Sequence, residues 1–123
     1  MHRNAKILVV DDSRVMRRIV IRCLDSLGFS NACEAENGLA ALAAVENGQI
    51  DMVLTDWCMP GMYGIDLLRA LRKNPRTAGI PVVMISAESQ PHLVEEAMRA
   101  GADYYVAKPF TCEVIQRALA KVL

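Results

Sequence analysis

Five short apolar runs alternate with five segments of helical periodicity along this chain, and this alternation limits the fold more than any other feature. The apolar runs predict strands near residues 6–10, 31–35, 51–55, 81–85 and 103–107. Apolar residues at three- and four-residue spacing predict helices over 15–27, 38–47, 64–73, 91–100 and 114–122. Strands that alternate with helices form a parallel sheet covered on both faces, joined by right-handed crossovers.

The runs also indicate which strands are central and how many domains to expect. Residues 7–10 and 82–85 are apolar throughout, as strands buried on both faces are. The run at 31–35 contains Glu34 and is followed by Glu36, which places this strand at an edge of the sheet. A chain of 123 residues suffices for one domain with one core. No linker, repeat or low-complexity segment divides it, so we expect a single domain over residues 1–123.

Composition excludes several classes of protein. Fourteen basic residues balance fourteen acidic ones, so no basic field exists for a nucleic-acid backbone or a membrane surface. No apolar run approaches the roughly 18 residues of a membrane span. Cys23, Cys33, Cys58 and Cys112 form no CxxC pair, and reduced thiols are the simplest interpretation without a secretory context. We therefore expect a cytoplasmic protein without membrane insertion.

Carboxylates gather where two of the predicted strands end. Asp11 and Asp12 follow the first run, and Asp56 ends the third. Ligands of open parallel sheets bind beyond the carboxyl ends of the strands, near the point where strand order reverses. Two carboxylates about 5 Å apart repel by roughly 3 kcal/mol at an effective dielectric near 20, so three together call for a cation. Oxygen ligands in an open site favour Mg²⁺.

Taken singly, the polar residues at the strand ends have ordinary structural explanations. Asp12 or Ser13 would cap the helix that follows, and Asp56 would serve in a turn. Lys108 would be a solvated lysine, and Ser86, at the end of the fourth run, would cap a helix. Their convergence favours a phosphate site instead, because Lys108 would bind phosphate as a compact point charge and Ser86 would donate to a phosphoryl oxygen.

Seven motifs then carry a resemblance to a known family. They are VVDDS at 9–13, MRRIV at 16–20, LGF at 27–29, TDWCMPGMYG at 55–64, ISAE at 85–88, AGA at 100–102 and YVAKPF at 105–110. In their order and spacing the chain resembles a response-regulator receiver domain across residues 6–122, and the single-domain chemotaxis members in particular. The resemblance implies a flavodoxin-like α/β fold, with a doubly wound five-stranded parallel sheet in order 2-1-3-4-5 and five helices.

The resemblance also implies roles at the acidic strand ends. Asp56 matches the phosphoacceptor, which becomes an acyl phosphate. Asp11 and Asp12 match the acidic pair that holds Mg²⁺ together with Asp56, and the backbone carbonyl of Cys58 would complete the metal shell. Lys108 matches the lysine that pairs with the phosphoryl group.

Two further positions match residues that move in this family when the phosphoacceptor is phosphorylated. Ser86 matches the switch hydroxyl that moves to the phosphoryl group, and Tyr105 matches the aromatic residue that then turns inward. The Lys108–Pro109 bond matches one that is typically cis, an isomer that proline makes accessible. Cys58 stands where asparagine is common in chemotaxis members, and Tyr63 stands where an acidic residue is frequent. The resemblance therefore does not imply a dephosphorylation rate at these two departures.

The function implied by the resemblance is a phosphorylation-activated switch of two-component signalling in chemotaxis, not an enzyme with a separate substrate. We expect a chemotaxis-type histidine kinase as phosphodonor, a flagellar motor switch protein or a phosphatase as further partners, no nucleic acid, and a monomer. The alternatives are a relay or phosphate sink in another pathway and an excised receiver of a larger regulator. A flavin-binding protein is disfavoured because Asp11 and Asp12 would repel its phosphate.

Overall fold

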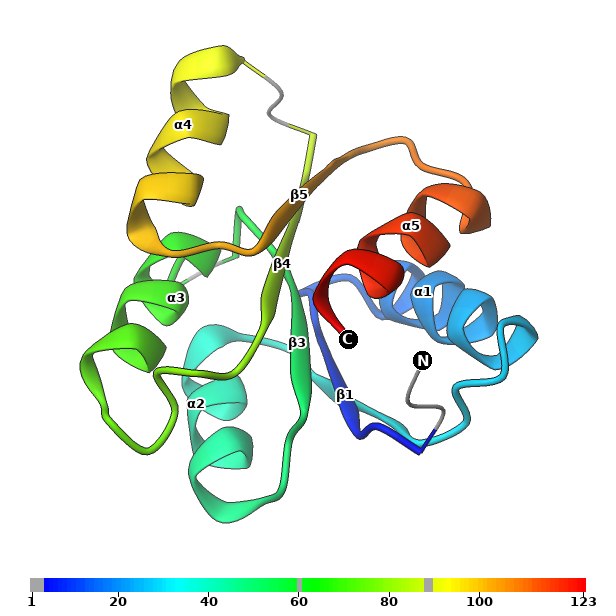
Figure 1. Cartoon of the computed structure of the whole chain (residues 1–123), viewed down its shortest axis with the longest axis horizontal. Coiled ribbons are helices and arrows are strands. Elements are labelled where there is room, and N and C mark those ends of the chain that lie inside the picture. The colour runs from blue at the N-terminus through cyan, green and yellow to red at the C-terminus, as the bar shows by residue number, and fades with distance from the viewer. Residues whose placement is uncertain (1–3, 60, 88–89) are drawn as a thin grey trace.

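The computed structural model describes residues 4–59, 61–87 and 90–123, and it contains the predicted strands and helices in the predicted order (Figure 1). The elements are β1 (Ile7–Val10), α1 (Arg14–Ser26), β2 (Ala32–Ala35), α2 (Gly38–Asn47), β3 (Met52–Asp56), α3 (Gly64–Lys73), β4 (Val82–Ser86), α4 (Pro91–Ala100), β5 (Tyr104–Ala107) and α5 (Cys112–Val122). Their ends differ from the predicted ends by at most two residues, which is the usual scatter at element boundaries.

All five strands are parallel, and their order is β2-β1-β3-β4-β5, which confirms the predicted topology. The chain starts at the second position of the sheet, adds β2 on one side, and then crosses over β1 to build the rest. The strand order therefore reverses between β1 and β3, the place where open parallel sheets bind ligands. β2 lies at an edge, as its glutamates indicated.

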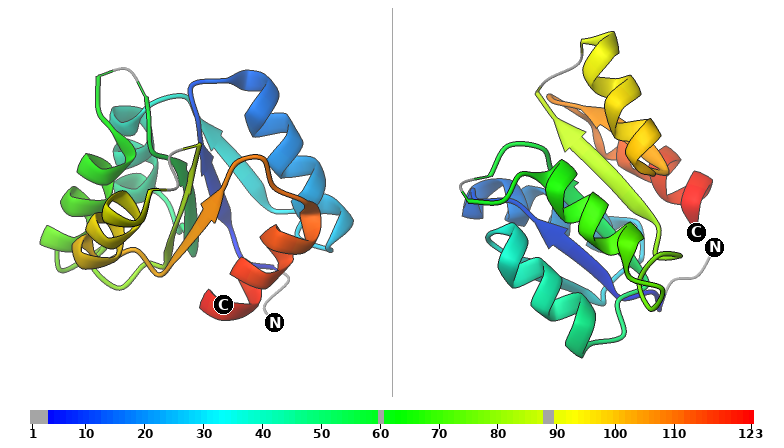
Figure 2. Two further views of the ribbon diagram at one scale, coloured as in Figure 1. Left: turned by 90° about the horizontal axis from the view of Figure 1, so that it is seen from above. Right: turned by 90° about the vertical axis from the view of Figure 1, so that its left-hand side faces the viewer.

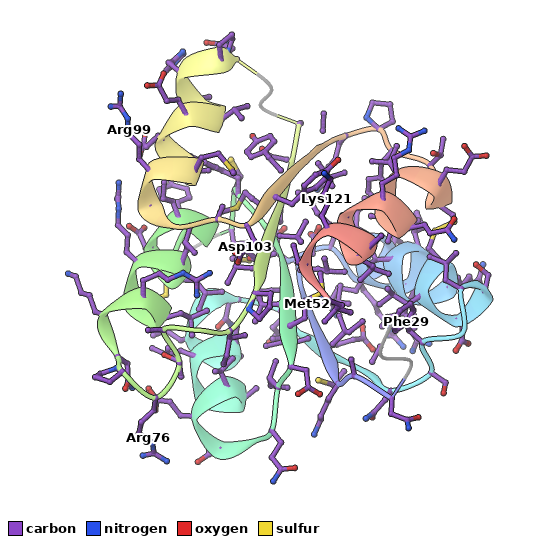
Figure 3. The ribbon with its side chains drawn as sticks, viewed as in Figure 1. Phe29, Met52, Arg76, Arg99, Asp103 and Lys121 are labelled. Carbon is purple, nitrogen blue, oxygen red and sulfur yellow. A yellow bond between two sulfur atoms is a disulfide. The ribbon has the colours of Figure 1, made fainter. Side chains whose placement is uncertain are left out.

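Helices cover both faces of the sheet, with α1 and α5 on one side and α2, α3 and α4 on the other (Figure 2). Successive strand residues therefore face two different cores: Leu8 and Val10 pack with α2 and α3, whereas Ile7 and Val9 pack with α1 and α5. Phe29 and Met52 are fully buried in the layer under α1 and α5 (Figure 3). On the other side of the sheet, Arg76 after α3 and Arg99 of α4 point outward. None of the helices in the described ranges is long and apolar enough to cross a membrane.

The first helix is capped by the residue that directly follows the acidic pair. The Ser13 side chain accepts a hydrogen bond from the Met16 N–H at 3.2 Å, so Ser13 is the cap and Asp12 is left available for another role. At the other end of α1, Gly28 has a φ of 93°, a left-handed conformation that glycine adopts without strain. Local sequence thus sets both ends of the helix behind the site.

Two cysteines form a disulfide, so the interpretation of all four as reduced thiols is wrong. Cys23 in α1 and Cys112 at the start of α5 are bonded, with their Cα atoms 5.4 Å apart. They are 89 positions apart in sequence and become neighbours only because α1 and α5 pack on the same face of the sheet. Cys33 and Cys58 take no part in a disulfide.

Candidate functional site

The strand register brings the predicted site residues to one edge of the sheet. Val10 pairs with Thr55, so that Asp11 and Asp56 are the next residues on two adjacent strands. On the other side, Ser86 pairs with Ala107, and Lys108 follows directly. The Lys108 N–H donates to the Ser86 carbonyl at 2.8 Å, which continues the backbone ladder into the site. The Lys108–Pro109 bond is cis, as predicted.

The charged side chains at this edge of the sheet lie close to one another. Lys108 Nζ lies 3.1 Å from Asp56 Oδ1 and 3.3 Å from Asp11 Oδ2. One carboxylate oxygen from each of Asp11, Asp12 and Asp56 lies within 4.8 Å of the other two. Asp11 and Asp56 are only 6% and 8% exposed, whereas Asp12 is open to solvent. Three carboxylates beside one ammonium leave two negative charges uncompensated, which is the charge that one divalent cation would neutralise.

Burial and charge shift the acid–base behaviour of the central pair. Burial, reinforced by the charge of Asp11, raises the pKa of the Asp56 carboxyl, although Lys108 and the Trp57 N–H oppose this shift. Burial would lower the pKa of Lys108, but the charges of Asp56 and Asp11 outweigh it, and the net shift is upward. Lys108 therefore holds its proton more tightly than a solvated lysine does, and Asp56 is a more basic carboxylate than a solvated one.

The two predicted switch residues lie on adjacent strands next to this cluster. Ser86 is 1% exposed at the end of β4. Tyr105 is half-buried in β5, where it pairs with Met84, and it packs against the core cluster that includes Ala97 of α4. Ser86 therefore belongs to the acidic edge of the sheet, whereas Tyr105 contacts the layer under α4. The structure brings together the side chains of Asp11, Asp12, Asp56 and Lys108. Ser86 and Tyr105 are placed by their positions on β4 and β5, and Cys58 lies in the loop after β3 with an exposed side chain.

Residues 7–120 match the family described as the response regulator receiver domain. The chain belongs to this family. The receiver is 47% identical to the chemotaxis protein CheY of Pseudomonas aeruginosa over 117 residues, which cover 95% of this chain and 94% of that protein. It is 46% identical to chemotaxis protein CheY-3 of Vibrio cholerae over 122 residues, covering 99% and 94%.

Solved structures agree with the sequence relatives. The receiver superposes on a high-resolution structure of the Vibrio cholerae chemotaxis protein CheY4 with a TM-score of 0.90 and 32% identity, over 98% of this chain and 99% of that one. A response regulator receiver protein from Pseudomonas putida gives a TM-score of 0.87 at 25% identity, over 98% and 99%. The comparisons thus confirm the predicted family and fold, and they are consistent with a phosphorylation-activated signalling switch that has a histidine kinase as partner.

Arg17 of α1 supports the acidic edge of the receiver and was not indicated by the sequence pattern. Its Nη1 donates to the Asp11 carbonyl at 2.7 Å, and its Nε lies 2.9 Å from a Glu34 carboxylate oxygen of β2. The Asp11 carboxylate also accepts the Ser13 N–H at 2.8 Å. These contacts fix both the backbone and the side chain of Asp11. An arginine within a helix is usually part of a solvated face, so only the tertiary structure reveals this role.

Gly64 packs closely against the backbone of Asp56, a role that the sequence pattern did not indicate. Its N–H donates to the Trp57 carbonyl at 2.7 Å, and a Cβ at this position would stand 2.0 Å from the Asp56 carbonyl oxygen. Any side chain at residue 64 would therefore displace the backbone that carries the carboxylate. The available signal was a glycine at the first position of a predicted helix, where better helix formers are usual.

The acidic residues of the receiver fit a small, hard cation. Mg²⁺ binds oxygen at about 2.1 Å in octahedral geometry, which places pairs of ligand oxygens about 3–4 Å apart. The three carboxylate oxygens lie within 4.8 Å of one another, so side-chain adjustments on the order of 1 Å would bring them into that range. Oxygen is the only donor type that these three side chains offer, which suits Mg²⁺ better than a transition metal.

Proposed function

We propose that this receiver is a phosphorylation-activated switch of two-component signalling in which Asp56 accepts the phosphoryl group. The observation that carries the proposal is a buried Asp56 carboxylate 3.1 Å from Lys108 Nζ, beside the carboxylates of Asp11 and Asp12. Buried carboxylates need their charge balanced, and Lys108 balances only one of the three charges in this cluster. The donor would be the phosphohistidine of a histidine kinase, the partner class that the family implies.

The transfer would use the residues in the positions described above. An Asp56 oxygen forms a bond to phosphorus while the bond from phosphorus to the donor imidazole nitrogen breaks, and the imidazole keeps the electron pair and takes up a proton. Lys108 exchanges its contact with Asp56 for the oxygens of the arriving phosphoryl group, and Ser86 donates a hydrogen bond to that group. The work of these residues is positioning and charge neutralisation, as in phosphoryl transfer generally.

Asp11, Asp12, Asp56 and the backbone carbonyl of Cys58 would hold Mg²⁺, which when bound supplies positive charge to the transferring phosphoryl group. We expect Mg²⁺ to raise the thermal midpoint of the protein, because at a hundred times its dissociation constant a ligand stabilises the folded state by about 2.7 kcal/mol. The indole of Trp57, which is buried and adjoins Asp56, should report binding through its fluorescence.

Asp12→Ala should lose both responses to Mg²⁺, since it removes the exposed carboxylate of the cluster without touching the core. The matched control is Asp25→Ala, which removes an exposed carboxylate from α1 away from the site and should titrate like the parent. An Asp12→Ala protein with the parent's titration curve would show that Asp12 is not a ligand.

Acetyl phosphate offers a test of the function without the kinase. In the presence of Mg²⁺ the intact protein should gain the mass of one phosphoryl group, and a chelator added beforehand should prevent the gain. A gain of equal rate and extent in the chelator would show that the reaction does not need the metal. No gain under either condition would contradict the switch itself.

Phosphorylation of Asp56 should reach a partner through Ser86 and Tyr105. Movement of Ser86 toward the phosphoryl group would leave space for Tyr105, which packs against the layer under α4. Such coupling is typically worth about 1–3 kcal/mol, so partner affinity should rise roughly 5- to 150-fold. Tyr105→Ala should accept phosphate normally yet bind its partner with little dependence on it. Ser86→Ala should accept phosphate more slowly and lose most of the affinity gain.

The partner in that assay follows from the pathway. We propose chemotaxis, which is supported by the names of the two relatives at 46–47% identity. On this proposal the receiver works as a monomeric single domain in the cytoplasm, with a flagellar motor switch protein or a phosphatase as partner. A relay or phosphate sink would instead pass its phosphoryl group on to another histidine.

Retention of the full phosphorylation-dependent affinity gain by the Tyr105→Ala protein would show that the coupling from Asp56 to the partner takes another route.

A further inference from the structure

The Cys23–Cys112 disulfide joins the two helices that lead away from opposite sides of the acidic site. α1 begins just after Asp12, and α5 begins just after the loop of Lys108. The two helices lie side by side over one face of the sheet (Figure 1). The bond therefore connects the segment that carries the acidic pair to the segment that carries the ammonium.

The two cysteine residues differ in their access to solvent. Cys23 is 6% exposed within α1, whereas Cys112 is exposed at the first position of α5, with Thr111 as its N-cap. The N–H groups of the first helical turn favour a negative charge on a thiolate there, although the carboxylate of Glu113 opposes it. Thiol reagents in solution can therefore reach Cys112 before they reach Cys23.

Packing, and not the bond alone, holds the two cysteines together. Val20 and Leu24 of α1 are buried in the same core cluster as Ile115 and Leu119 of α5. These contacts do not depend on the oxidation state of the sulfurs, so the reduced protein would keep both thiols in place. Two cysteines that packing holds in place can form and break their disulfide while the protein stays folded.

We propose that Cys23 and Cys112 are a redox-active pair that exchanges with low-molecular-weight thiols and disulfides, with Cys112 as the entry sulfur. In oxidation, the Cys112 thiolate attacks a disulfide R–S–S–R, forms a mixed disulfide with one half and releases the other as a thiolate. Cys23, after losing its proton, attacks the Cys112 sulfur and releases the second thiolate. Two protein thiols are thus oxidised, one R–S–S–R is reduced to two thiols, and the two protons pass to the released thiolates.

The test uses the full chain with Cys33→Ser and Cys58→Ser, so that only the pair reacts. The folded protein is equilibrated with reduced and oxidised glutathione at a series of ratios, quenched with acid and alkylated, and its mass is measured. We expect conversion between the disulfide and the dithiol, which after alkylation carries two added groups, within that series and without denaturant. A protein that stays oxidised at every ratio would have a fixed structural disulfide. A protein that never oxidises would not form a disulfide between Cys23 and Cys112. Either result overturns the proposal.

The order of attack is tested by removing one sulfur at a time in the same background. Cys23→Ala should accumulate one glutathione on Cys112, whereas Cys112→Ser should react at Cys23 at least about tenfold more slowly because that sulfur is buried. Equal rates would contradict Cys112 as the entry sulfur. If Cys23→Ala does not fold, rapidly quenched samples of the background protein show by peptide mass which cysteine carries glutathione first. None of these readouts requires a phosphodonor, so failure here is distinct from failure of Asp56 as phosphoacceptor.

Discussion

The Asp56→Asn protein should take up no phosphoryl group from acetyl phosphate in the presence of Mg²⁺, whereas the parent gains one. An amide has nearly the shape of a carboxylate but no nucleophilic oxyanion, so the chemistry is removed while the volume is kept. Intact mass spectrometry over a time course measures the loss, which should be complete. This is the largest functional effect that we expect from a single substitution.

The fold of Asp56→Asn should survive, because the substitution also removes one charge from a cluster that carries two uncompensated negative charges. The far-ultraviolet circular dichroism spectrum should therefore match the parent. Asp25→Asn is the matched control: the same change on an exposed residue of α1 should leave phosphoryl uptake at the parent's rate. If the Asp56→Asn protein is labelled as fast as the parent, the phosphoacceptor is another residue.

Loss of the disulfide should have the largest effect on stability. Cross-linking residues 23 and 112 closes a segment with a sequence separation of 89, and the chain-entropy model assigns such a loop about 4–5 kcal/mol of stabilisation. Urea unfolding with and without reductant, followed by circular dichroism, should show the midpoint move to lower urea in the reduced protein. The urea dependence of the unfolding free energy should also rise, because the reduced denatured chain exposes more surface.

The control for this effect is Cys58→Ser, which replaces an exposed cysteine outside the disulfide and should unfold like the parent. Cys112→Ser should reproduce the reduced parent without any reductant. Identical midpoints for the oxidised parent and Cys112→Ser would mean that the bond adds no stability to the fold.

The sequence was sufficient to predict the sheet and the acidic edge, because local signals determine both. The runs at 7–10 and 82–85 are apolar throughout, which predicted strands buried on both faces, and parallel strands bring their carboxyl ends to one edge. The predicted order 2-1-3-4-5 came from the family resemblance, and the observed pairing of β1 with both β2 and β3 confirms it.

The parts that could not be predicted depend on contacts between distant segments. Nothing near Cys23 indicates Cys112, since their approach follows from how α1 and α5 pack on the sheet. Arg17 looks like one more charge on an exposed helix face until its contact with the Asp11 carbonyl is seen. Gly64 has an evident role only when the distance to the Asp56 carbonyl oxygen is known. Each is a property of tertiary packing that residue type and spacing do not record.

The central claim is that the phosphoryl group resides on Asp56, and the most direct measurement is to locate it chemically. Borohydride reduces an aspartyl phosphate to homoserine, so treatment of the acetyl-phosphate-labelled protein, digestion and tandem mass spectrometry identify the modified residue. We expect homoserine at position 56, dependent on both phosphodonor and Mg²⁺. Homoserine at position 11 or 12, or a mass gain with no reducible aspartate, would contradict it.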